Sequence, residues 1–378
     1  MNVAFDASAI LGRSGIERYS RELIKGLIRT QTVESVTLVV DKRDSGSVSA
    51  YFAKNPNVRV LERLTHERLL GAPLRPVARM LRQWELTSSV QDADVVHLLS
   101  PGKIIPRRRP LLTTIHDLFP MYPDMGIEGY LARRFPGRIR RHLAASDAIL
   151  CPSSYVASTI REFFPSCDLP IHVTPLAAGE EFVPTPLNDE VRKHYGLERP
   201  YILFVGRVDP RKNLHRMMMA WKSLPKTYRQ NADFVLMMAG GSNVIDRFRS
   251  DYASVMDEPS IRIITDVPTA SMVQILSSAR ALAFATLGEG FGLPVLEAMR
   301  CGCPVITSNT TSLPEVGGSV ALYVNPTDAE QIATLMQRCL EDDDLVAERR
   351  ADGIRHSSMF TWDATARATA DAYRSVIG

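Results

Sequence analysis

The chain has 378 residues, which is too many for one ordinary hydrophobic core, and 45% hydrophobic and 23% charged residues are typical of a globular protein. No stretch approaches the roughly 18 to 20 uncharged apolar residues that a membrane-spanning helix needs. The five cysteines form no CxxC pair, which argues against a disulfide framework. We therefore expect two domains and a cytoplasmic protein.

The formal net charge of +3 is unevenly distributed. Residues 1–178 carry 24 Lys and Arg against 17 Asp and Glu, a balance of +7, whereas the rest of the chain has a balance of −4. A basic first half suits an anionic partner, such as phospholipid headgroups, a lipid-diphosphate acceptor or nucleic acid.

The first half alternates short β-branched segments with longer amphipathic segments, of which the first is a helix expected over about 16–29. The expected strands are 3–8, 36–40, 58–61, 94–100, 111–117, 148–153 and 171–176. This alternation predicts an α/β domain with a doubly wound parallel sheet.

A second series of the same kind follows a stretch rich in proline and acidic residues. Its expected strands are 201–207, 234–240, 261–267, 281–286, 304–308 and 321–325. We expect a Rossmann-like N-terminal domain over 1–178 and a second one over 179–360, with the hinge between Val173 and Pro184. The amphipathic segment 361–378 predicts a closing helix that packs back on the first domain.

The first expected strand leads into a loop with Gly12 and Gly15, followed by a helix. Small residues there allow a ligand close to the amide groups of the helix N-terminus, where an anion is favoured. A dinucleotide fingerprint is the competing interpretation, but the third glycine is missing and Arg13 in the turn suits a phosphate better.

His116 and Asp117 end another expected strand at the ligand-binding edge of the sheet. His116 could hydrogen-bond a sugar hydroxyl or share a developing charge, although a lone histidine is more often structural. Asp117 could orient an acceptor hydroxyl or cap the next turn.

Two basic amphipathic segments, 63–85 and 130–143, lie in the first half. Either could rest on an anionic inner membrane, and ordinary solvated helix faces are the alternative. No nucleic-acid-binding motif or aromatic platform accompanies them, so we expect no nucleic-acid partner.

The strand expected over 201–207 is followed by a turn with two cations, Arg207 and Lys212. Cations at this edge of a parallel sheet could neutralise a leaving diphosphate, Arg207 as a two-pronged donor and Lys212 as a point charge. A solvated basic loop is the alternative.

The most informative stretch is ALAFATLGEGFGLPVLEAMRCGCPVITSN. A buried strand ends in a glycine-rich turn that carries Glu289, and a helix begins near Pro294 with Glu297 about one turn inside it. Free amide groups at the start of that helix suit an anion or a sugar. Two carboxylates and three glycines exceed what a capped turn requires.

This stretch resembles the EGFGxPxxEAMxxGxPV signature of the glycogen-synthase-like glycosyltransferases, known as family 4, and the resemblance extends over the whole chain. Gly206, Arg207, Lys212 and Asn213 match the GRxxxxKN pattern of the same family. The resemblance implies the GT-B fold, two Rossmann-like domains facing a cleft, and a retaining transfer of a hexose from a nucleotide sugar to a lipid-linked or oligosaccharide acceptor.

The family's site residues carry over to this chain by position. Glu289 would contact the hydroxyl groups of the donor sugar, Glu297 those of the ribose, and His116 would touch the sugar. The catalytic set is then Arg207, Lys212, Glu289, His116 and Asp117. The donor-binding set is Gly12, Gly15, Gly206, Arg207, Lys212, Val267, Glu289, Gly290, Phe291, Gly292, Leu293 and Glu297.

We expect no metal and no cofactor besides the nucleotide sugar. The metal-dependent transferases of the other major fold use a DxD motif. Asp92 and Asp94 have that spacing but precede a strand, and the acidic run from Asp342 to Asp344 is expected on a polar helix surface. No side chain is a clear nucleophile. We therefore favour front-face transfer, in which the departing diphosphate takes the proton of the acceptor hydroxyl.

The likeness to bacterial surface-polysaccharide mannosyltransferases favours GDP-mannose as the donor. A UDP-sugar donor is the first alternative, because base selection depends on the loop around Val267. A non-catalytic nucleotide-sugar-binding protein is the second.

Overall fold

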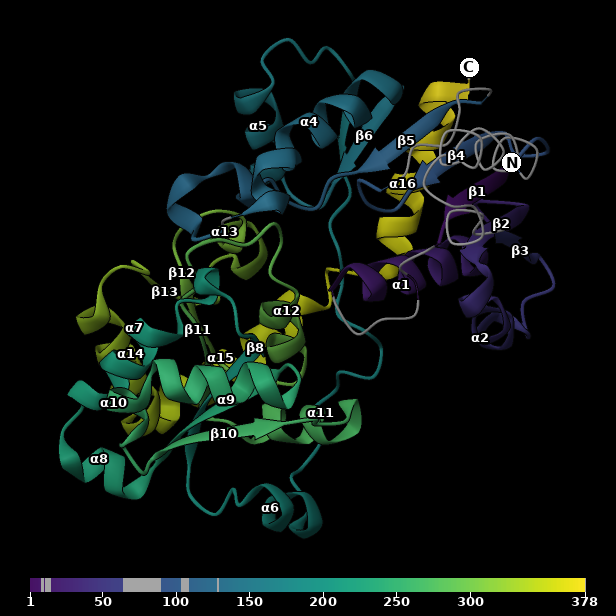
Figure 1. Ribbon diagram of the computed structural model, residues 1–378. Helices are drawn as coiled ribbons and strands as arrows, with labels where there is room; N and C mark the ends of the chain where they lie inside the picture. The colour runs from purple at the N-terminus through teal and green to yellow at the C-terminus, as the bar shows by residue number, and fades with distance from the viewer. Residues whose placement is uncertain (8–9, 11–14, 64–89, 103–108, 128, 378) are drawn as a thin grey trace. The chain divides into compact units, whose positions relative to one another are not determined.

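The computed structural model describes residues 1–7, 10, 15–63, 90–102, 109–127 and 129–377 (Figure 1). The chain forms two compact units. Unit 1 comprises Met1–Met121, Glu128–Leu176 and Thr361–Gly378, and unit 2 comprises Tyr122–Ile127 and Ala177–Phe360. Each unit holds one parallel sheet with helices on it, which confirms the predicted pair of doubly wound Rossmann-like α/β folds.

The sheet of unit 1 has seven strands in the order β3-β2-β1-β4-β5-β6-β7, and every neighbouring pair is parallel. The strands are β1 (Asn2–Asp6), β2 (Ser35–Asp41), β3 (Val58–Arg63), β4 (Val95–Leu98), β5 (Leu111–Thr114), β6 (Ala148–Cys151) and β7 (Ile171–Val173). All four residues of β4, β5 and β6 are buried, as expected for strands covered on both faces.

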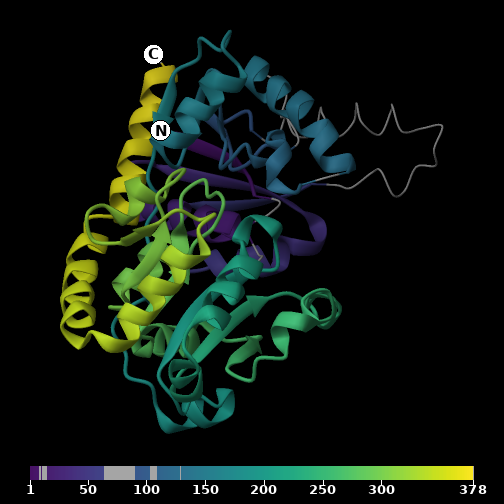
Figure 2. The ribbon, with the colours of Figure 1, turned by 90° about the vertical axis from the view of Figure 1, so that its left-hand side faces the viewer.

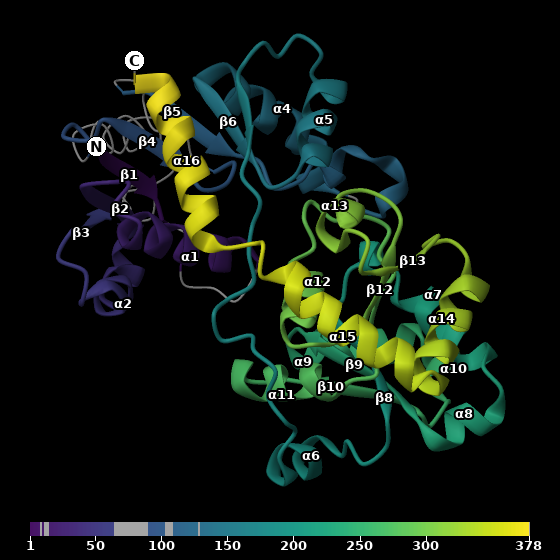
Figure 3. The ribbon, with the colours of Figure 1, turned by 180° about the vertical axis from the view of Figure 1, so that it is seen from behind.

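Within the described residues, the helices of unit 1 are α1 (Gly15–Arg29), α2 (Lys42–Phe52), α4 (Tyr130–Ala145), α5 (Ser154–Phe163) and α16 (Trp362–Ile377), with a 3₁₀ turn, η3 (Phe119–Met121). In Figure 2 the yellow α16 lies along one side of the strands and the blue α4 along the other. Figure 3 shows α16 beside α1, and the two helices are in contact. Gly26 permits this close packing, since a Cβ there would lie 2.9 Å from the carbonyl oxygen of Trp362.

The sheet of unit 2 has six strands in the order β10-β9-β8-β11-β12-β13. They are β8 (Tyr201–Arg207), β9 (Asp233–Ala239), β10 (Ile261–Thr265), β11 (Ala281–Phe284), β12 (Val305–Ser308) and β13 (Leu322–Val324). These six strands and the seven of unit 1 correspond to the thirteen strands expected from the sequence.

The larger helices of unit 2 are α7 (Leu214–Ser223), α9 (Ser242–Asp251), α11 (Thr269–Ser278), α12 (Leu293–Arg300), α14 (Ala329–Glu341) and α15 (Asp343–Ser357). Shorter ones are η4 (Pro123–Met125), α6 (Asp189–Tyr195), η5 (Pro210–Lys212), α8 (Lys226–Asn231), α10 (Ala253–Met256) and α13 (Leu313–Gly317). Asn188 caps α6 and Asp328 caps α14, each by accepting hydrogen bonds from first-turn amide groups.

Both sheets reverse their strand order once, between β1 and β4 in unit 1 and between β8 and β11 in unit 2. Open α/β sheets bind ligands beyond the carboxyl ends of the strands at such a reversal. The turns after β8 and β11 lie at the reversal in unit 2.

One strand boundary differs from the expectation. We expected His116 and Asp117 to end a strand over 111–117, but β5 ends at Thr114. The ladder continues only as far as Ile115, whose amide group bonds the carbonyl of Leu150, and the chain then turns toward η3.

Candidate active site

The turn after β8 carries the two cations of the second motif. Arg207 is the last residue of β8 and is exposed. Its side chain makes no hydrogen bond or ion pair within the part of the chain that the structure describes. Asp209 caps η5 by accepting a hydrogen bond from the amide of Arg211 at 2.9 Å, and Lys212 ends this short turn. Arg207 is therefore a cation available to a ligand.

Asn213 ties this turn to two other loops of unit 2. Its backbone is left-handed, with φ of 56°. The side-chain amide donates to the carbonyl of Ala285 at 2.8 Å and to that of Pro326 at 2.7 Å. A main-chain bond of 2.7 Å from Leu287 to Arg211 joins the same two turns. Asn213 matches a family motif, but its role could not be predicted from the sequence, because its partners lie far along the chain.

The glycine-rich turn follows β11 and leads into α12. Gly292 precedes the helix at φ of 110°, where L-residues are strained, and a Cβ there would lie 2.7 Å from Leu313. Pro294 occupies the first turn of α12, as expected. Gly290, Phe291 and Leu293 complete the turn as predicted from the sequence.

Ser312 and Thr311 hold this turn from the loop after β12. The Ser312 hydroxyl is buried and lies 2.7 Å from the carbonyl of Glu289 and 2.8 Å from that of Phe291. The amide of Glu289 donates to the Thr311 hydroxyl at 3.3 Å. Neither residue was predicted as part of the site, because the only local signal for them is the helix start SLPE after a strand.

Lys212 and Glu289 meet, although 77 residues separate them. The ammonium of Lys212 donates to Oε1 of Glu289 at 2.6 Å, and both side chains are mostly buried, at 15% and 13% exposed. The same ammonium lies 5.0 Å from the centre of the Phe284 ring, within the range of a cation–π contact. Because β8 and β11 are neighbours in the sheet, their turns bring the two predicted motifs together.

The remaining predicted residues of unit 2 also lie at the carboxyl ends of strands or in the segments that follow those ends. Glu297 lies inside α12 and is buried. Gly206 is the penultimate residue of β8, and a Cβ there would lie 2.8 Å from the Phe204 ring. Val267 follows β10, directly after Asp266, whose backbone is left-handed.

His116 is the central predicted residue of unit 1. Its Nε2 lies 2.8 Å from the carbonyl oxygen of Leu99, so this nitrogen carries the proton and donates it. Burial lowers the pKa of His116 to about 4, and the bond to Leu99 offsets only part of that effect. The imidazole is therefore neutral near pH 7, and Nδ1 is left as an acceptor. Of the two sequence-based roles, this arrangement favours hydrogen bonding to a hydroxyl over sharing a charge.

Asp117 caps the next turn, which was one of its two expected roles. Its Oδ1 accepts a hydrogen bond from the amide of Phe119 at 3.3 Å, at the start of η3. Gly15 is the first residue of α1, whereas Gly12 lies outside the described residues.

The Asp-Ala-Asp sequence precedes β4, at the amino end of that strand. Asp94 accepts a hydrogen bond from the amide of Asn2 at 2.7 Å, so its carboxylate secures the start of β1. Asp92 is exposed in the turn before it. This pair lies at the opposite end of the sheet of unit 1 from His116, which follows the neighbouring strand β5.

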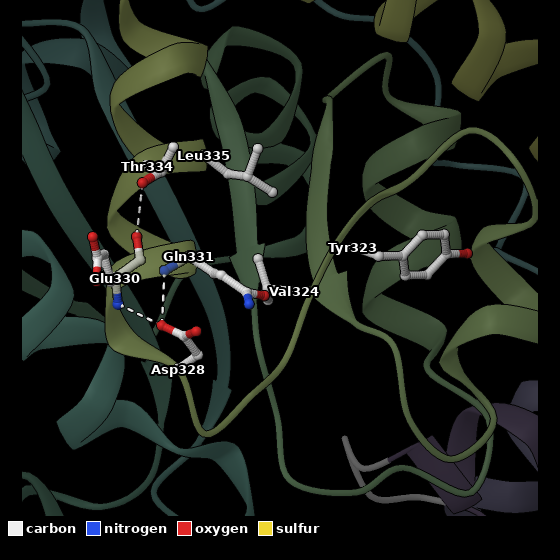
Figure 4. A pocket seen from close by; sticks show the side chains of 7 residues that line it. All are labelled: Tyr323, Val324, Asp328, Glu330, Gln331, Thr334 and Leu335. Atoms are coloured by element: carbon white, nitrogen blue, oxygen red, sulfur yellow. Dashed lines mark hydrogen bonds between the residues drawn. The ribbon is translucent and has the colours of Figure 1, made fainter.

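A separate open hollow of about 420 Å³ lies at the start of α14 (Figure 4). Its lining residues are Tyr323, Val324, Asp328, Glu330, Gln331, Thr334 and Leu335. Asp328 already accepts two amide hydrogen bonds of 3.0 Å as the cap of α14. None of the predicted site residues lines this hollow, so it is not part of the candidate site.

Two family models match the chain, one in each half. Residues 13–177 match the model described as Glycosyltransferase Family 4, and residues 188–356 match that described as Glycosyl transferases group 1. Together they extend over most of both units.

Curated relatives with similar sequences include mannosyltransferases. The chain is 27% identical over 391 residues to the O-antigen chain mannosyltransferase B of Escherichia coli, with 96% of each chain covered. It is 30% identical over 273 residues to the serotype-specific mannosyltransferase WbdA of Escherichia coli, which covers 69% of this chain and 33% of WbdA. The chain thus spans about one third of the length of WbdA.

Solved structures of similar fold include sucrose-phosphate synthase from Thermosynechococcus elongatus, with a TM-score of 0.76, 19% identity and coverage of 99% and 98% of the two chains. Anabaena HepE in complex with UDP and glucose has a TM-score of 0.74 at 15% identity and covers 99% of this chain and 100% of its own. WaaG, a glycosyltransferase of lipopolysaccharide biosynthesis, has a TM-score of 0.70 at 14% identity, with 98% and 99% covered. From the two family matches, the two Rossmann-like sheets and the motif residues on their strand ends, we conclude that the chain belongs to the family 4, group 1 glycosyltransferases and has the GT-B fold.

Proposed function

We propose that this glycosyltransferase moves mannose from GDP-mannose to a lipid-linked or glycan acceptor in the synthesis of a bacterial surface polysaccharide, with retention of configuration and without a metal ion. The observation that carries the proposal is the meeting of Lys212 and Glu289, in which Lys212 comes from the turn that follows the available cation Arg207. The two cations offer positive charge for a diphosphate, and the carboxylate of Glu289 offers an acceptor for the hydroxyl groups of a sugar.

In this mechanism Arg207 and Lys212 stabilise the negative charge that develops on the departing diphosphate. Lys212 exchanges part of its contact with Glu289 for a phosphate oxygen. Glu289 then accepts hydrogen bonds from the sugar, and Glu297 accepts them from the ribose. Partial burial strengthens these charge interactions, because water screens them less.

The proposed transfer occurs on one face of the sugar. The diphosphate leaves, takes the proton of the acceptor hydroxyl, and the acceptor oxygen then bonds the anomeric carbon on the same face. His116 takes no proton in this scheme. Its neutral Nδ1 accepts a hydrogen bond from a hydroxyl group of the donor sugar and orients the ring.

The mannose assignment rests on the two mannosyltransferases among the relatives. A UDP-sugar donor is the second candidate, because a structure of similar fold was solved with UDP and glucose. The two candidates differ in the base and the sugar, while the predicted phosphate contacts are the same.

A membrane-bound acceptor is supported by the charge on α4. The exposed residues of this helix include Arg133, Arg134, Arg140 and Arg141, two pairs that lie two helical turns apart on one face. None of the described helices has the length and apolarity needed to cross a bilayer. Of the other basic segment, 63–85, only residue 63 belongs to the described part of the chain.

The first experiment measures thermal stabilisation by GDP, UDP, ADP and dTDP, with and without EDTA. The proposal expects a shift with GDP that EDTA does not change and that both Arg207→Ala and Glu297→Ala abolish. A shift with UDP alone would replace the donor assignment. No shift with any of the nucleotides would contradict nucleotide-sugar binding by this site.

The second experiment incubates the enzyme with GDP-mannose and a mannose-terminated oligosaccharide and follows the anomeric proton of the product by NMR. An α-configured product from the α-configured donor supports retention, whereas a β-configured product would overturn it.

Co-sedimentation with phosphatidylglycerol vesicles tests the membrane contact, and charge reversal at Arg133 and Arg140 should abolish it. Reversal at Arg247, exposed on α9 of unit 2, is the matched control.

A further inference from the structure

Four buried polar side chains form a continuous hydrogen-bonded chain in unit 1, here called the polar array. Tyr373 of α16 lies 2.7 Å from Nδ1 of His97 on β4. Nε2 of His97 lies 2.7 Å from the hydroxyl of Thr114 on β5, which lies 2.9 Å from the hydroxyl of Tyr19 on α1. None of the four side chains is more than 1% exposed.

The polar array is uncharged near neutral pH. Burial, with a smaller effect from nearby His116, lowers the pKa of His97 to about 3. Burial also raises the pKa of both Tyr19 and Tyr373. The three hydroxyl groups and the neutral imidazole hold four protons, which is enough for the three hydrogen bonds. Fully paired polar groups in a low-dielectric interior hold their geometry firmly.

The polar array ends against His116. The ring of Tyr19 meets the imidazole of His116 edge to face, with 4.8 Å between the ring centres. A tyrosine ring fixed at its hydroxyl can therefore fix the orientation of the imidazole beside it.

The strands of the polar array are also those that present His116 and its acceptor. Thr114 precedes His116 by two residues at the end of β5, and His97 precedes Leu99 by two residues at the end of β4. The bond from Thr114 to His97 thus holds together the two strand ends that the bond from His116 to Leu99 also connects.

We propose that the residues of the polar array, Tyr373, His97, Thr114 and Tyr19, are positioning residues for His116. The C-terminal helix α16 thereby contributes to the active site through the hydroxyl group of Tyr373. This inference rests on the proposed role of His116 as acceptor of a sugar hydroxyl. The array fixes the rotamer in which Nε2 is bound to Leu99 and Nδ1 is available to the donor.

Tyr373→Phe tests the proposal, because it removes one oxygen and keeps the ring, whose centre is 5.6 Å from that of His97. We expect kcat to fall about fivefold with little change in the donor KM. Tyr201→Phe is the matched control, since it removes another buried tyrosine hydroxyl, bonded to the carbonyl of Ile275 in unit 2. It should lower Tm by a similar amount and leave kcat unchanged.

A double-mutant cycle separates positioning from general stability. If the array acts through His116, Tyr373→Phe changes kcat by less than about twofold once His116→Ala is present. The same fivefold loss in both backgrounds would overturn the proposal. If His116→Ala alone has no effect on kcat, the proposed role of His116 in transfer fails. The positioning by the array is then tested without activity, by NMR titration of the His116 imidazole in wild type and Tyr373→Phe, and an unchanged titration would overturn it.

The pH dependence and a conservative rescue give further readouts. Among the residues that the structure describes, the titratable groups that face His116 are Tyr19 on α1 and His97 on β4, with Asp117 next to it in the chain. A loosened His116 should titrate closer to its ordinary pKa of about 6.5, so the acid limb of kcat should move to higher pH in Tyr373→Phe and in Thr114→Val. Thr114→Ser, which keeps the hydroxyl, should restore the acid limb. An unchanged limb in both impaired variants would contradict the proposal.

Discussion

The two units present polar groups at equivalent strand ends but hold them by different means. In unit 2 the turns after β8 and β11 carry opposite charges that pair directly, Lys212 with Glu289. In unit 1 the ends of β4 and β5 carry uncharged groups, among them His97 and His116, whose pKa values burial lowers. Charged side chains suit unit 2, which we expect to bind the diphosphate. A neutral hydrogen-bond acceptor in unit 1 suits a sugar hydroxyl.

The difference also concerns how each site is fixed. The turns of unit 2 are tied by bonds from side chains to main-chain carbonyls, such as those of Asn213 and Ser312. His116 is oriented by a ring contact and by the main chain of the neighbouring strand. Four substitutions probe this comparison, from the largest expected effect to the smallest.

Lys212→Ala tests whether unit 2 acts through charge. Removing one of two cations from the diphosphate should lower kcat about 10²- to 10³-fold, because charge stabilisation in a partly buried site is lost. Lys222→Ala is the matched control, since that lysine pairs with Asp257 on the surface of the same unit. Steady-state kinetics of both variants provide the measurement. A loss of less than threefold in Lys212→Ala would contradict the role of this cation.

Asn213→Ala tests the tie between the turns of unit 2. It removes three hydrogen bonds, two donated by the buried side-chain amide and one accepted from Arg216, and it strains a left-handed backbone, so the free energy of unfolding should fall by about 2–4 kcal/mol. Asn213→Gly loses the same bonds without the strain and should retain about 1 kcal/mol more. Chemical denaturation measures both variants. Equal losses would show that backbone strain contributes nothing here.

Substitution of His97 tests whether the buried polar groups of unit 1 are uncharged, through the pH dependence of the free energy of unfolding. Between pH 6.5 and about 3 the unfolded chain binds a proton at this residue that the native chain does not bind. The free energy of unfolding should therefore fall as the pH falls, by about 1.4 kcal/mol per pH unit from this histidine. Denaturation at pH 7, 6 and 5 should give a shallower slope for His97→Asn than for wild type. His215→Asn, exposed on α7, should leave the slope as it is.

Gly26→Val tests the contact between α1 and α16 that supports the polar array. Its side chain would meet the carbonyl of Trp362 and the Cβ of Ala366, so the free energy of unfolding should fall by about 1–3 kcal/mol. Gly46→Ala on α2 is the opposite case, because a Cβ there meets nothing within 4 Å. It should stabilise the protein by about 0.5–1 kcal/mol. Thermal denaturation that ranks the two variants in the reverse order would contradict this view of the helix contact.

Much of the fold could be predicted because its signals are local. Each strand is a short β-branched run, and each predicted turn carries glycine or proline, so the alternation in the chain already indicates two parallel sheets. The glycine-rich turn with Glu289 and Glu297 could also be predicted from the sequence, since its conformation depends on residues within the motif. The end of β5 was predicted at Asp117 instead of Thr114, because a run of buried apolar residues does not show where the hydrogen bonds to the neighbouring strand stop.

By itself the sequence determined which residues have the chemistry for a diphosphate and a sugar, and in which turns they lie. Only the tertiary structure decided that Lys212 meets Glu289 across 77 residues, and that Tyr373 meets His97 across 276. It also decided the charge state of His116, which follows from burial and from the carbonyl of Leu99. The physical reason is that hydrogen bonds, ion pairs and desolvation depend on distances in space, which strand order sets and which no local pattern in the chain records.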